Sequence, residues 1–281
     1  MESNNDFILV KRGRRKCVRK SDPGNSDTLP KGLQKDKATD DFDVDSFKST
    51  LANRKSRVGD FVDEILRNRT LSNYLERFKY LNIACYGLGK FSRCSTARCQ
   101  LALLLVLIDK LNSKFDMKIS FVKCFDPIFN NFEKCWISDN FLISKSEMAN
   151  DRCLYTGKND EDLLTLFYMP HSGRPMYNNV LYANWSAEQL SRICVFGNTF
   201  STIIQQRLFH SKNNRSLKNL HATVENQLVE EIILPDFDAE ENVFNDTAIH
   251  IFRKTNLTRF DFQKNTFEQP IYDSVTEIIL D

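Results

Sequence analysis

Two glycines at the end of an apolar run are the first residues whose spacing could do chemistry. The segment NIACYGLGKFS places Gly87 and Gly89 between a predicted buried strand and a helical pattern. In a dinucleotide-binding turn the first glycine makes the bend, the second lets the backbone approach phosphate, and the third lets the helix pack on the strand. Here Ser92 stands in the third position. The turn is therefore either a phosphate cradle or a tight corner between a strand and a helix.

An acidic residue follows the second predicted strand, where a ribose-binding carboxylate would stand. Asp126 lies well beyond the roughly 20 residues that usually separate the glycines from that carboxylate. It also precedes Pro127, so it could equally cap or turn the chain. The helix after the glycines still offers free N–H groups to an anion. On the ligand-binding reading, the group held here is a nucleotide, a nicotinamide or S-adenosylmethionine.

His171 is the candidate acid/base residue, because it follows a predicted strand and an imidazole titrates near neutrality. The alternative is a histidine that is hydrogen-bonded for structural reasons. No catalytic partner can be assigned, because the chain carries no P-loop, no HExxH and no GxSxG segment. None of its eight cysteines has CxxC spacing, so we expect no metal site.

Four more polar residues follow predicted strands. Asn178 and Asn179 either orient a ligand or cap a helix, and capping is the interpretation we favour. Asn198 and Thr199 are interpreted in the same two ways, because a helical pattern follows them.

The elements that must position these residues are short apolar runs alternating with helical patterns. Strands are expected at 82–86, 119–125, 141–144, 165–169 and 192–196, and helices after 47, at 92–111, 129–136, 177–183, from 186 and at 200–209. Segments 227–234 and 248–252 join the sheet or a helix beside it. This alternation predicts an α/β, Rossmann-like, mostly parallel sheet of about five to seven strands flanked by helices. Polar residues after its strands would converge on the carboxyl edge, where ligands bind in open α/β sheets.

Charge and composition divide the chain into three parts. Residues 1–45 are predicted to form a disordered basic N-terminal arm, 46–265 a single domain and 266–281 a peripheral tail. Residues 11–20, KRGRRKCVRK, hold seven basic residues and no acid, while the remaining residues are net acidic. The arm is either a nuclear-import or weak polyanion-binding segment or a solvated tail. We therefore expect a cytoplasmic and nuclear protein that does not bind nucleic acid as its main activity. The longest apolar run, 101–108, is too short for a membrane span.

Six segments together resemble a known family. CYGLGKFS, ARCQLALLLVL, FDPIF, TLFYMPH, YNNVLYANW and VFGNTFS occur in this order, and they resemble the sensitivity-to-red-light-reduced-like family over about residues 47–252. The resemblance implies an α/β domain with a regulatory role. It links plant members to red-light signalling and clock input, animal members to circadian rhythm and haem biosynthesis, and a fungal member to microtubule stability.

The resemblance assigns motif positions but no catalytic residues. The motif positions are Gly87, Gly89, Asp126, His171, Asn179 and Asn198. Two departures are visible: LISKSEMANDRCLY keeps Glu147 but lacks an acidic turn, and Ser172 stands where relatives often have cysteine.

Two functional readings remain open. The first is a regulator in a circadian clock input pathway or of haem biosynthesis, with unidentified protein partners and no defined catalytic activity. The alternative is a Rossmann-like cofactor-binding enzyme with a small-molecule ligand held at the sheet edge. The identity of any cofactor stays unknown at this stage.

Overall fold

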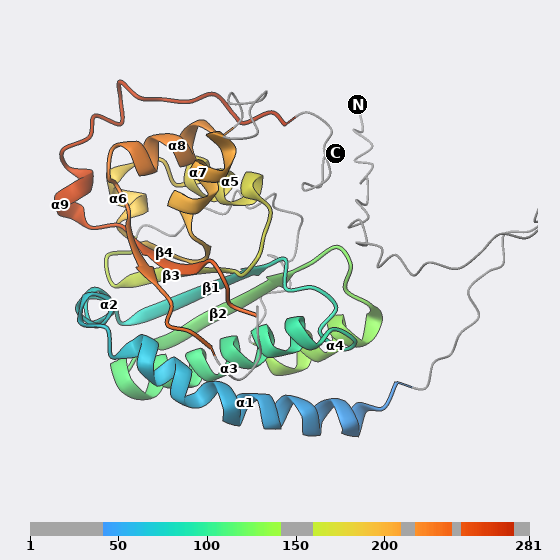
Figure 1. Cartoon of the computed structure of the whole chain (residues 1–281). Helices are drawn as coiled ribbons and strands as arrows, with labels where there is room; N and C mark the ends of the chain where they lie inside the picture. The colour runs from blue at the N-terminus through green and yellow to red at the C-terminus, as the bar shows by residue number, and fades with distance from the viewer. Residues whose placement is uncertain (1–41, 142–159, 209–216, 238–242, 273–281) are drawn as a thin grey trace, which may run out of the picture.

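A six-stranded sheet between two layers of helices forms the centre of the molecule (Figure 1). The computed structural model describes residues 42–141, 160–208, 217–237 and 243–272. The strand order is β2-β1-β3-β4-β6-β5. The strands are β1 (Tyr80–Tyr86), β2 (Lys118–Phe125), β3 (Leu163–Met169), β4 (Ile193–Asn198), β5 (Glu230–Ile233) and β6 (Thr247–Ile251).

The first four strands are parallel, and β6 pairs antiparallel with both β4 and β5. After β1, the chain places β2 on one side of it. It then places β3, followed by β4, on the other side of β1. The crossover direction therefore reverses between β1 and β3. In open α/β sheets such a switch point leaves a crevice at the carboxyl ends of the strands.

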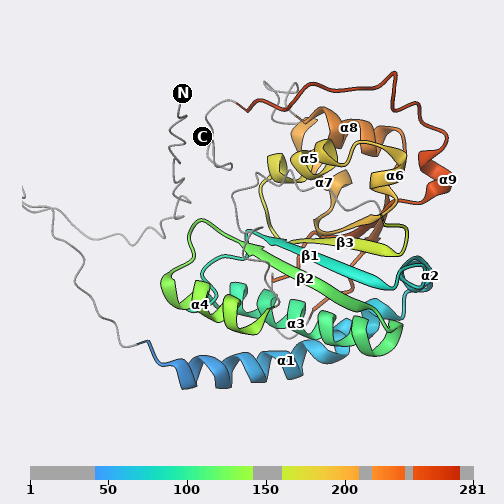
Figure 2. The same ribbon diagram turned by 180° about the vertical axis from the view of Figure 1, so that it is seen from behind.

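One face of the sheet is covered by the N-terminal helices, as seen from both sides in Figures 1 and 2. They are α1 (Val44–Leu66), α2 (Arg69–Leu75), α3 (Ser95–Phe115) and α4 (Asn131–Asn140). Helix α3 carries the apolar run 101–108. It packs against α1 and also against residues of the sheet that belong to the same hydrophobic core. Because α3 is buried against both α1 and the sheet, its surface is apolar on nearly all sides.

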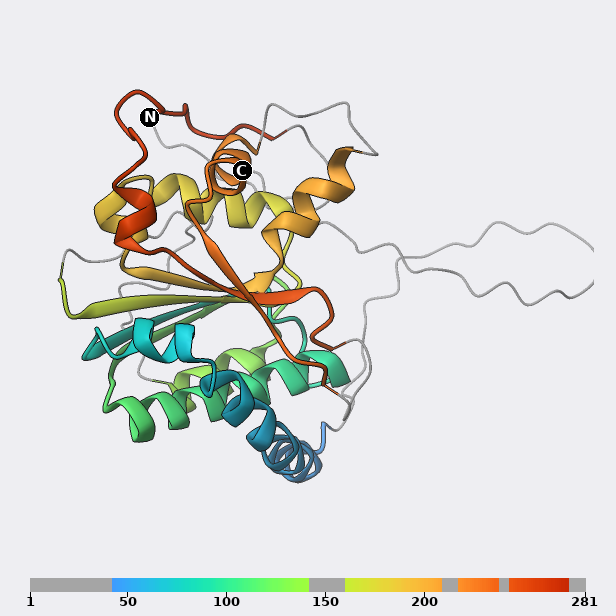
Figure 3. The same cartoon turned by 60° about the vertical axis from the view of Figure 1, so that its left-hand side comes forward.

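The opposite face is covered by the later helices, and Figure 3 shows the two layers on either side of the twisted sheet. They are α5 (Arg174–Ala183), α6 (Ala187–Leu190), α7 (Phe200–Leu208), α8 (Lys218–Glu225) and α9 (Lys254–Leu257). Side chains alternate between two cores along β1. Ile83 and Cys85 join the core beneath α1 and α3, whereas Ala84 and Tyr86 join the core beneath α5 and α7. Burial on both faces explains the continuous apolar runs of these strands.

The predicted mixed α/β architecture with a mostly parallel sheet is confirmed, and most elements occur where the sequence pattern places them. The strand expected at 141–144 lies almost wholly outside the described residues, as does most of the expected N-terminal arm. Segments 227–234 and 248–252 supply strands β5 and β6 rather than a helix. None of the helices in the described part of the chain is long and apolar enough to cross a membrane.

Two predicted boundaries are wrong for local reasons. Strand β4 continues to Asn198 rather than ending at 196, because Gly197 and Asn198 pair with Ala248 and Thr247 of β6. Helix α3 begins at Ser95 rather than at 92, because the amides of Arg93 and Cys94 bond to the Lys90 carbonyl in a separate turn.

Candidate functional site at the carboxyl edge of the sheet

The segments after β1 and β3 meet directly at the switch point. A Cβ atom placed on Gly87 would lie 2.9 Å from Ser172 Oγ. The same hydroxyl donates a hydrogen bond of 3.4 Å to the Tyr86 carbonyl. Gly87 and Ser172 thus close the space between β1 and β3, and only a residue without a side chain fits at position 87.

Asp126 lies at the glycine turn, as the sequence predicts. Gly87 and Gly89 both have positive φ, 67° and 83°, which favours glycine. The Gly89 amide donates to Asp126 Oδ2 at 2.7 Å, and Asp126 Oδ1 accepts from the Ile128 amide at 3.0 Å. One carboxylate therefore closes the glycine turn and also turns the chain after β2. It occupies the Gly89 amide, which a phosphate oxygen would otherwise use.

Ser92 is held by a carboxylate that the sequence reading did not single out. Glu133 is fully buried, and its Oε1 accepts from the Ser92 amide at 2.9 Å and the Ser92 hydroxyl at 2.8 Å. Its Oε2 accepts from the Asn130 amide at 2.9 Å, which completes a capping box at the start of α4. The Asn130-to-Glu133 spacing is the one sequence signal that could have identified this residue. We call residues 87–94, together with Asp126 and Glu133, the glycine corner.

His171 and Asn198 are brought together, as expected for ends of adjacent strands. The His171 backbone has φ of 56°, which is uncommon for a residue other than glycine. Its amide donates to Asn198 Oδ1 at 3.0 Å, and its ring Nε2 lies 2.6 Å from the Val243 carbonyl. Since a carbonyl only accepts, Nε2 carries a proton. The histidine links β3, β4 and the segment before β6.

Tyr177 supports the same edge from within α5. Its hydroxyl donates to the Met169 carbonyl at 2.7 Å and accepts from the Asn198 amide at 2.9 Å. The ring packs so closely that a Cβ on Gly197 would lie 2.5 Å from it. The glycine in VFGNTFS is therefore required by packing against Tyr177.

The proposed capping role of Asn198 and Thr199 is wrong, because their side chains have other partners. Asn198 accepts from His171, and the Thr199 hydroxyl donates to the Asp246 carbonyl at 3.1 Å. The start of α7 is capped instead from β5, since the Ser201 amide donates to Glu231 Oε1 at 3.0 Å.

Glu231 forms a pair with a fully buried histidine that the sequence reading also missed. His250 Nε2 lies 3.3 Å from Glu231 Oε1, and His250 Nδ1 lies 2.9 Å from the Val195 carbonyl. Burial by itself raises the pKa of Glu231, but hydrogen bonds from His250 and Ser201 outweigh it and hold that pKa below its ordinary value. The two residues face each other on β5 and β6.

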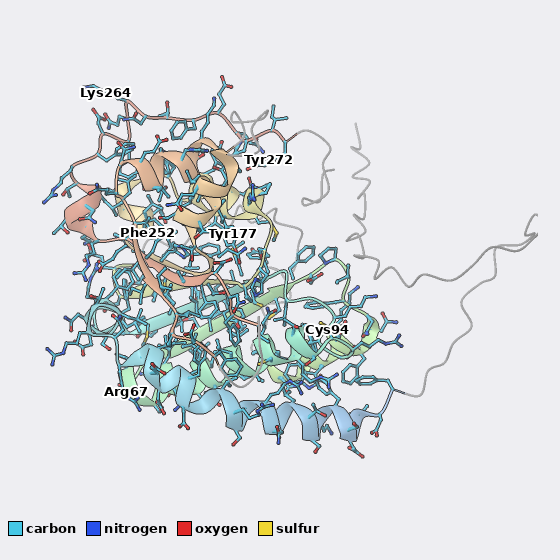
Figure 4. All side chains as sticks on the ribbon, viewed as in Figure 1. Arg67, Cys94, Tyr177, Phe252, Lys264 and Tyr272 are labelled. Atoms are coloured by element: carbon cyan, nitrogen blue, oxygen red, sulfur yellow. The ribbon has the colours of Figure 1, made fainter. Side chains whose placement is uncertain are left out.

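Asn178 and Asn179 do not cap the helix that follows them, but Asn178 caps the first turn of α8 from a distance. Both lie inside α5, where Asn178 Oδ1 accepts from the Leu220 amide of α8 at 3.0 Å. Asn178 Nδ2 donates to the Tyr272 hydroxyl at 3.0 Å, and that hydroxyl donates to Asn179 Oδ1 at 2.7 Å. Figure 4 shows Tyr177 in the interior beside the sheet and Tyr272 at the outer end of the helical layer. Asn178 and Asn179 are therefore joined to the C-terminal segment through Tyr272.

The edge thus pairs Gly89 with Asp126 and His171 with Asn198, while Gly87 lies against Ser172 and Ser92 is held by Glu133. Within the residues that the structure describes, no group of three His, Cys, Asp or Glu side chains could hold a metal ion. The arrangement binds its own carboxylates at the amides where an anionic ligand would bind.

Residues 62–251 match the family model described as the SRR1 domain, and the chain belongs to this family. The match includes every strand of the sheet. The resemblance read from the sequence motifs is confirmed.

Three relatives span animals and plants. The SRR1-like protein of Mus musculus is 35% identical over 46% of this chain and 48% of its own length. The SRR1-like protein of Drosophila melanogaster is 29% identical over 91% of this chain and 85% of its own length. Protein SENSITIVITY TO RED LIGHT REDUCED 1 of Arabidopsis thaliana is 27% identical over 61% of this chain and 58% of its own length. The alignments thus span about half of the mouse and plant proteins. No solved structure matches the chain.

Proposed function

We propose that this protein is a regulator in a pathway that conveys light information to the circadian clock. The observation that carries the proposal is the SRR1-domain match over residues 62–251, together with the Arabidopsis relative whose name refers to red-light sensitivity. Regulation of haem biosynthesis is a second output that the family resemblance implies.

The edge site supports a role in binding rather than in turnover. Its carboxylates at 126 and 133 are occupied by backbone donors of the same domain, and His171 is held at its amide and at Nε2. A group that performs acid/base chemistry must reach a substrate atom. We therefore propose that the domain acts through protein partners that contact its surface.

Removal of the protein from its source cells tests the regulatory role. We expect the period or the light-induced phase shift of a clock-controlled reporter to change, and the wild-type chain to restore it. Haem content measured in the same cells tests the second output. Unchanged rhythm, unchanged light response and unchanged haem content would refute the proposal.

The basic segment 11–20 lies outside the described residues, and we propose that it directs part of the protein to the nucleus. Deletion of these ten residues is expected to shift a fluorescent fusion toward the cytoplasm. An unchanged distribution of the fusion between nucleus and cytoplasm would show that the segment does not direct the protein to the nucleus.

A Rossmann-like cofactor-binding enzyme remains a second candidate because of the switch point between β1 and β3. A left-handed His171 at this position is the kind of strained residue that occurs at functional sites. Thermal unfolding with nucleotides, nicotinamides, S-adenosylmethionine and haem tests this function. A ligand at 100 times its Kd stabilises the fold by about 2.7 kcal/mol. His171→Asn, which tolerates the backbone conformation, should reduce the shift, and no shift with any compound would exclude these ligands.

A further inference from the structure

The C-terminal segment lies across the helical layer as a strap whose residues are exposed or only partly buried. Residues 258–272, which we call the C-terminal strap, follow α9 and pass over the outer side of the α5–α8 layer (Figure 1). Leu257 is the last buried residue in the described part of the chain. The strap also lies beyond residue 251, where the match to the family domain ends.

Aromatic contacts fix the middle of the strap to one tryptophan. The Trp185 ring lies 5.9 Å from Phe260, 5.4 Å from Phe262 and 5.3 Å from Phe267, measured between ring centroids. Its indole N–H donates to the Asn265 carbonyl at 2.8 Å. Trp185 therefore contacts both the aromatic side chains and the backbone of the segment that covers it, at the point where the Asn265 amide closes a turn onto the Asp261 carbonyl.

A tyrosine hydroxyl fixes the end of the strap to two asparagines. Tyr272 OH accepts from Asn178 at 3.0 Å and donates to Asn179 at 2.7 Å, and the Pro175 carbonyl lies 3.3 Å away. Asn178 is fully buried and Asn179 is 6% exposed. Two buried amide side chains thus share one hydroxyl of a segment that has no buried residue of its own, and Asn178 also accepts from Leu220. We call Pro175, Asn178, Asn179 and Trp185 the strap seat.

We propose that the strap seat is a docking surface for a segment of a partner protein that turns as the strap does, and that the strap is its resting occupant. The partner segment has the chemistry that the strap displays: phenylalanine rings for Trp185 and, about five residues later, a tyrosine hydroxyl for the two asparagines. Exchange is feasible because segments with few buried contacts open without unfolding the rest of the domain. The proposal does not rest on the role in light signalling.

A labelled peptide with the sequence of residues 258–272 tests docking against the full-length protein. The wild-type strap competes as an intramolecular ligand, so it should suppress peptide binding. A full-length variant with Phe262→Ser, Phe267→Ser and Tyr272→Ala should bind the peptide at least about tenfold more tightly than the wild type does. A peptide with Tyr272→Phe should bind this variant several-fold more weakly. Equal binding to variant and wild type, or no binding to a variant that remains folded by circular dichroism, would overturn the proposal.

Ile271→Ala is the matched control, because this neighbouring side chain is 85% exposed. It should leave peptide binding at the wild-type level. Hydrogen exchange of the wild-type protein provides a second readout that needs no substitution. The amides of the strap should exchange much faster than the amides of β1 and β3. If the strap amides exchanged only at the rate of global unfolding, as the strand amides do, the strap would not be displaceable.

Discussion

The glycine corner and the C-terminal strap both contact family-motif residues, but they are held in opposite ways. At the corner, buried carboxylates at 126 and 133 bond to backbone donors at 89, 92, 128 and 130. At the strap, partly buried rings and one hydroxyl contact a surface on α5 and Trp185, which stands two residues after the end of α5. Substitutions at the corner should therefore change global stability, whereas substitutions in the strap should change local opening.

The difference also separates two kinds of polar motif residue. Asp126 and Ser92 fix the backbone between strands and helices, and they are satisfied without any ligand. Asn178 and Asn179 both bond to Tyr272, a partly buried residue near the end of the described chain, and Asn178 also accepts from Leu220. A polar motif residue therefore indicates a binding site more strongly when the residue to which it is hydrogen-bonded is weakly anchored.

The largest effect is expected from Glu133→Ala. Three donors, the Ser92 amide, the Ser92 hydroxyl and the Asn130 amide, lose their buried acceptor. Each buried unpaired donor costs about 1–3 kcal/mol, so the free energy of unfolding should fall by more than about 3 kcal/mol. Urea denaturation measures it. Glu133→Gln keeps one carbonyl oxygen, so its free energy of unfolding should fall less. A fall of less than about 1 kcal/mol for Glu133→Ala would contradict the contrast between the glycine corner and the strap.

The next largest effect is expected from Gly87→Ala. The alanine Cβ would lie 2.9 Å from Ser172 Oγ at a backbone φ of 67°. The left-handed backbone alone costs about 1–2 kcal/mol for a non-glycine residue, and the steric contact adds to it. Gly59→Ala is the matched control, because nothing lies within 4 Å of its Cβ in helix α1. It should stabilise the protein by roughly 0.5–1 kcal/mol, so the two variants should shift Tm in opposite directions.

A smaller and pH-dependent effect is expected from Glu231→Gln. Hydrogen bonds to the ionised Glu231 hold its pKa below 4.5 despite burial, so its ionised form stabilises the folded state above that pH. The variant should be less stable by about 1.5 kcal/mol at pH 7. This difference should shrink as the pH falls through the lowered pKa, because Glu231 is then protonated in the wild type. Paired denaturation curves between pH 7 and pH 3 measure it, and a constant difference would contradict this origin.

The smallest global effect is expected from Tyr272→Phe. The variant loses the hydroxyl that contacts Asn178 and Asn179, but the strap contributes no buried residue. We expect the global free energy of unfolding to change by less than about 1 kcal/mol. Hydrogen exchange of the strap amides should nevertheless accelerate several-fold. A global loss comparable with that of Glu133→Ala would show that the strap is part of the cooperative core.

The sequence by itself determined the elements and the edge on which the motif residues gather. Apolar runs of strand length, interrupted by glycine or proline, predict β1, β2, β3 and β4, because these signals are local. The glycine pair, Asp126, His171 and Asn198 were placed together because parallel strands end on the same edge of a sheet.

Only the tertiary structure decided which donor meets which acceptor. Ser92 and Glu133 are 41 residues apart, and Asn178 and Tyr272 are 94 apart. Neither periodicity nor motif spacing contains information at such separations. The antiparallel pairing that joins Glu231 to His250, and the passage of the strap over α5, arise from the packing of two cores on one sheet. Because of that packing, the Gly89 amide, which the sequence offers as a phosphate-binding group, donates instead to the carboxylate of Asp126.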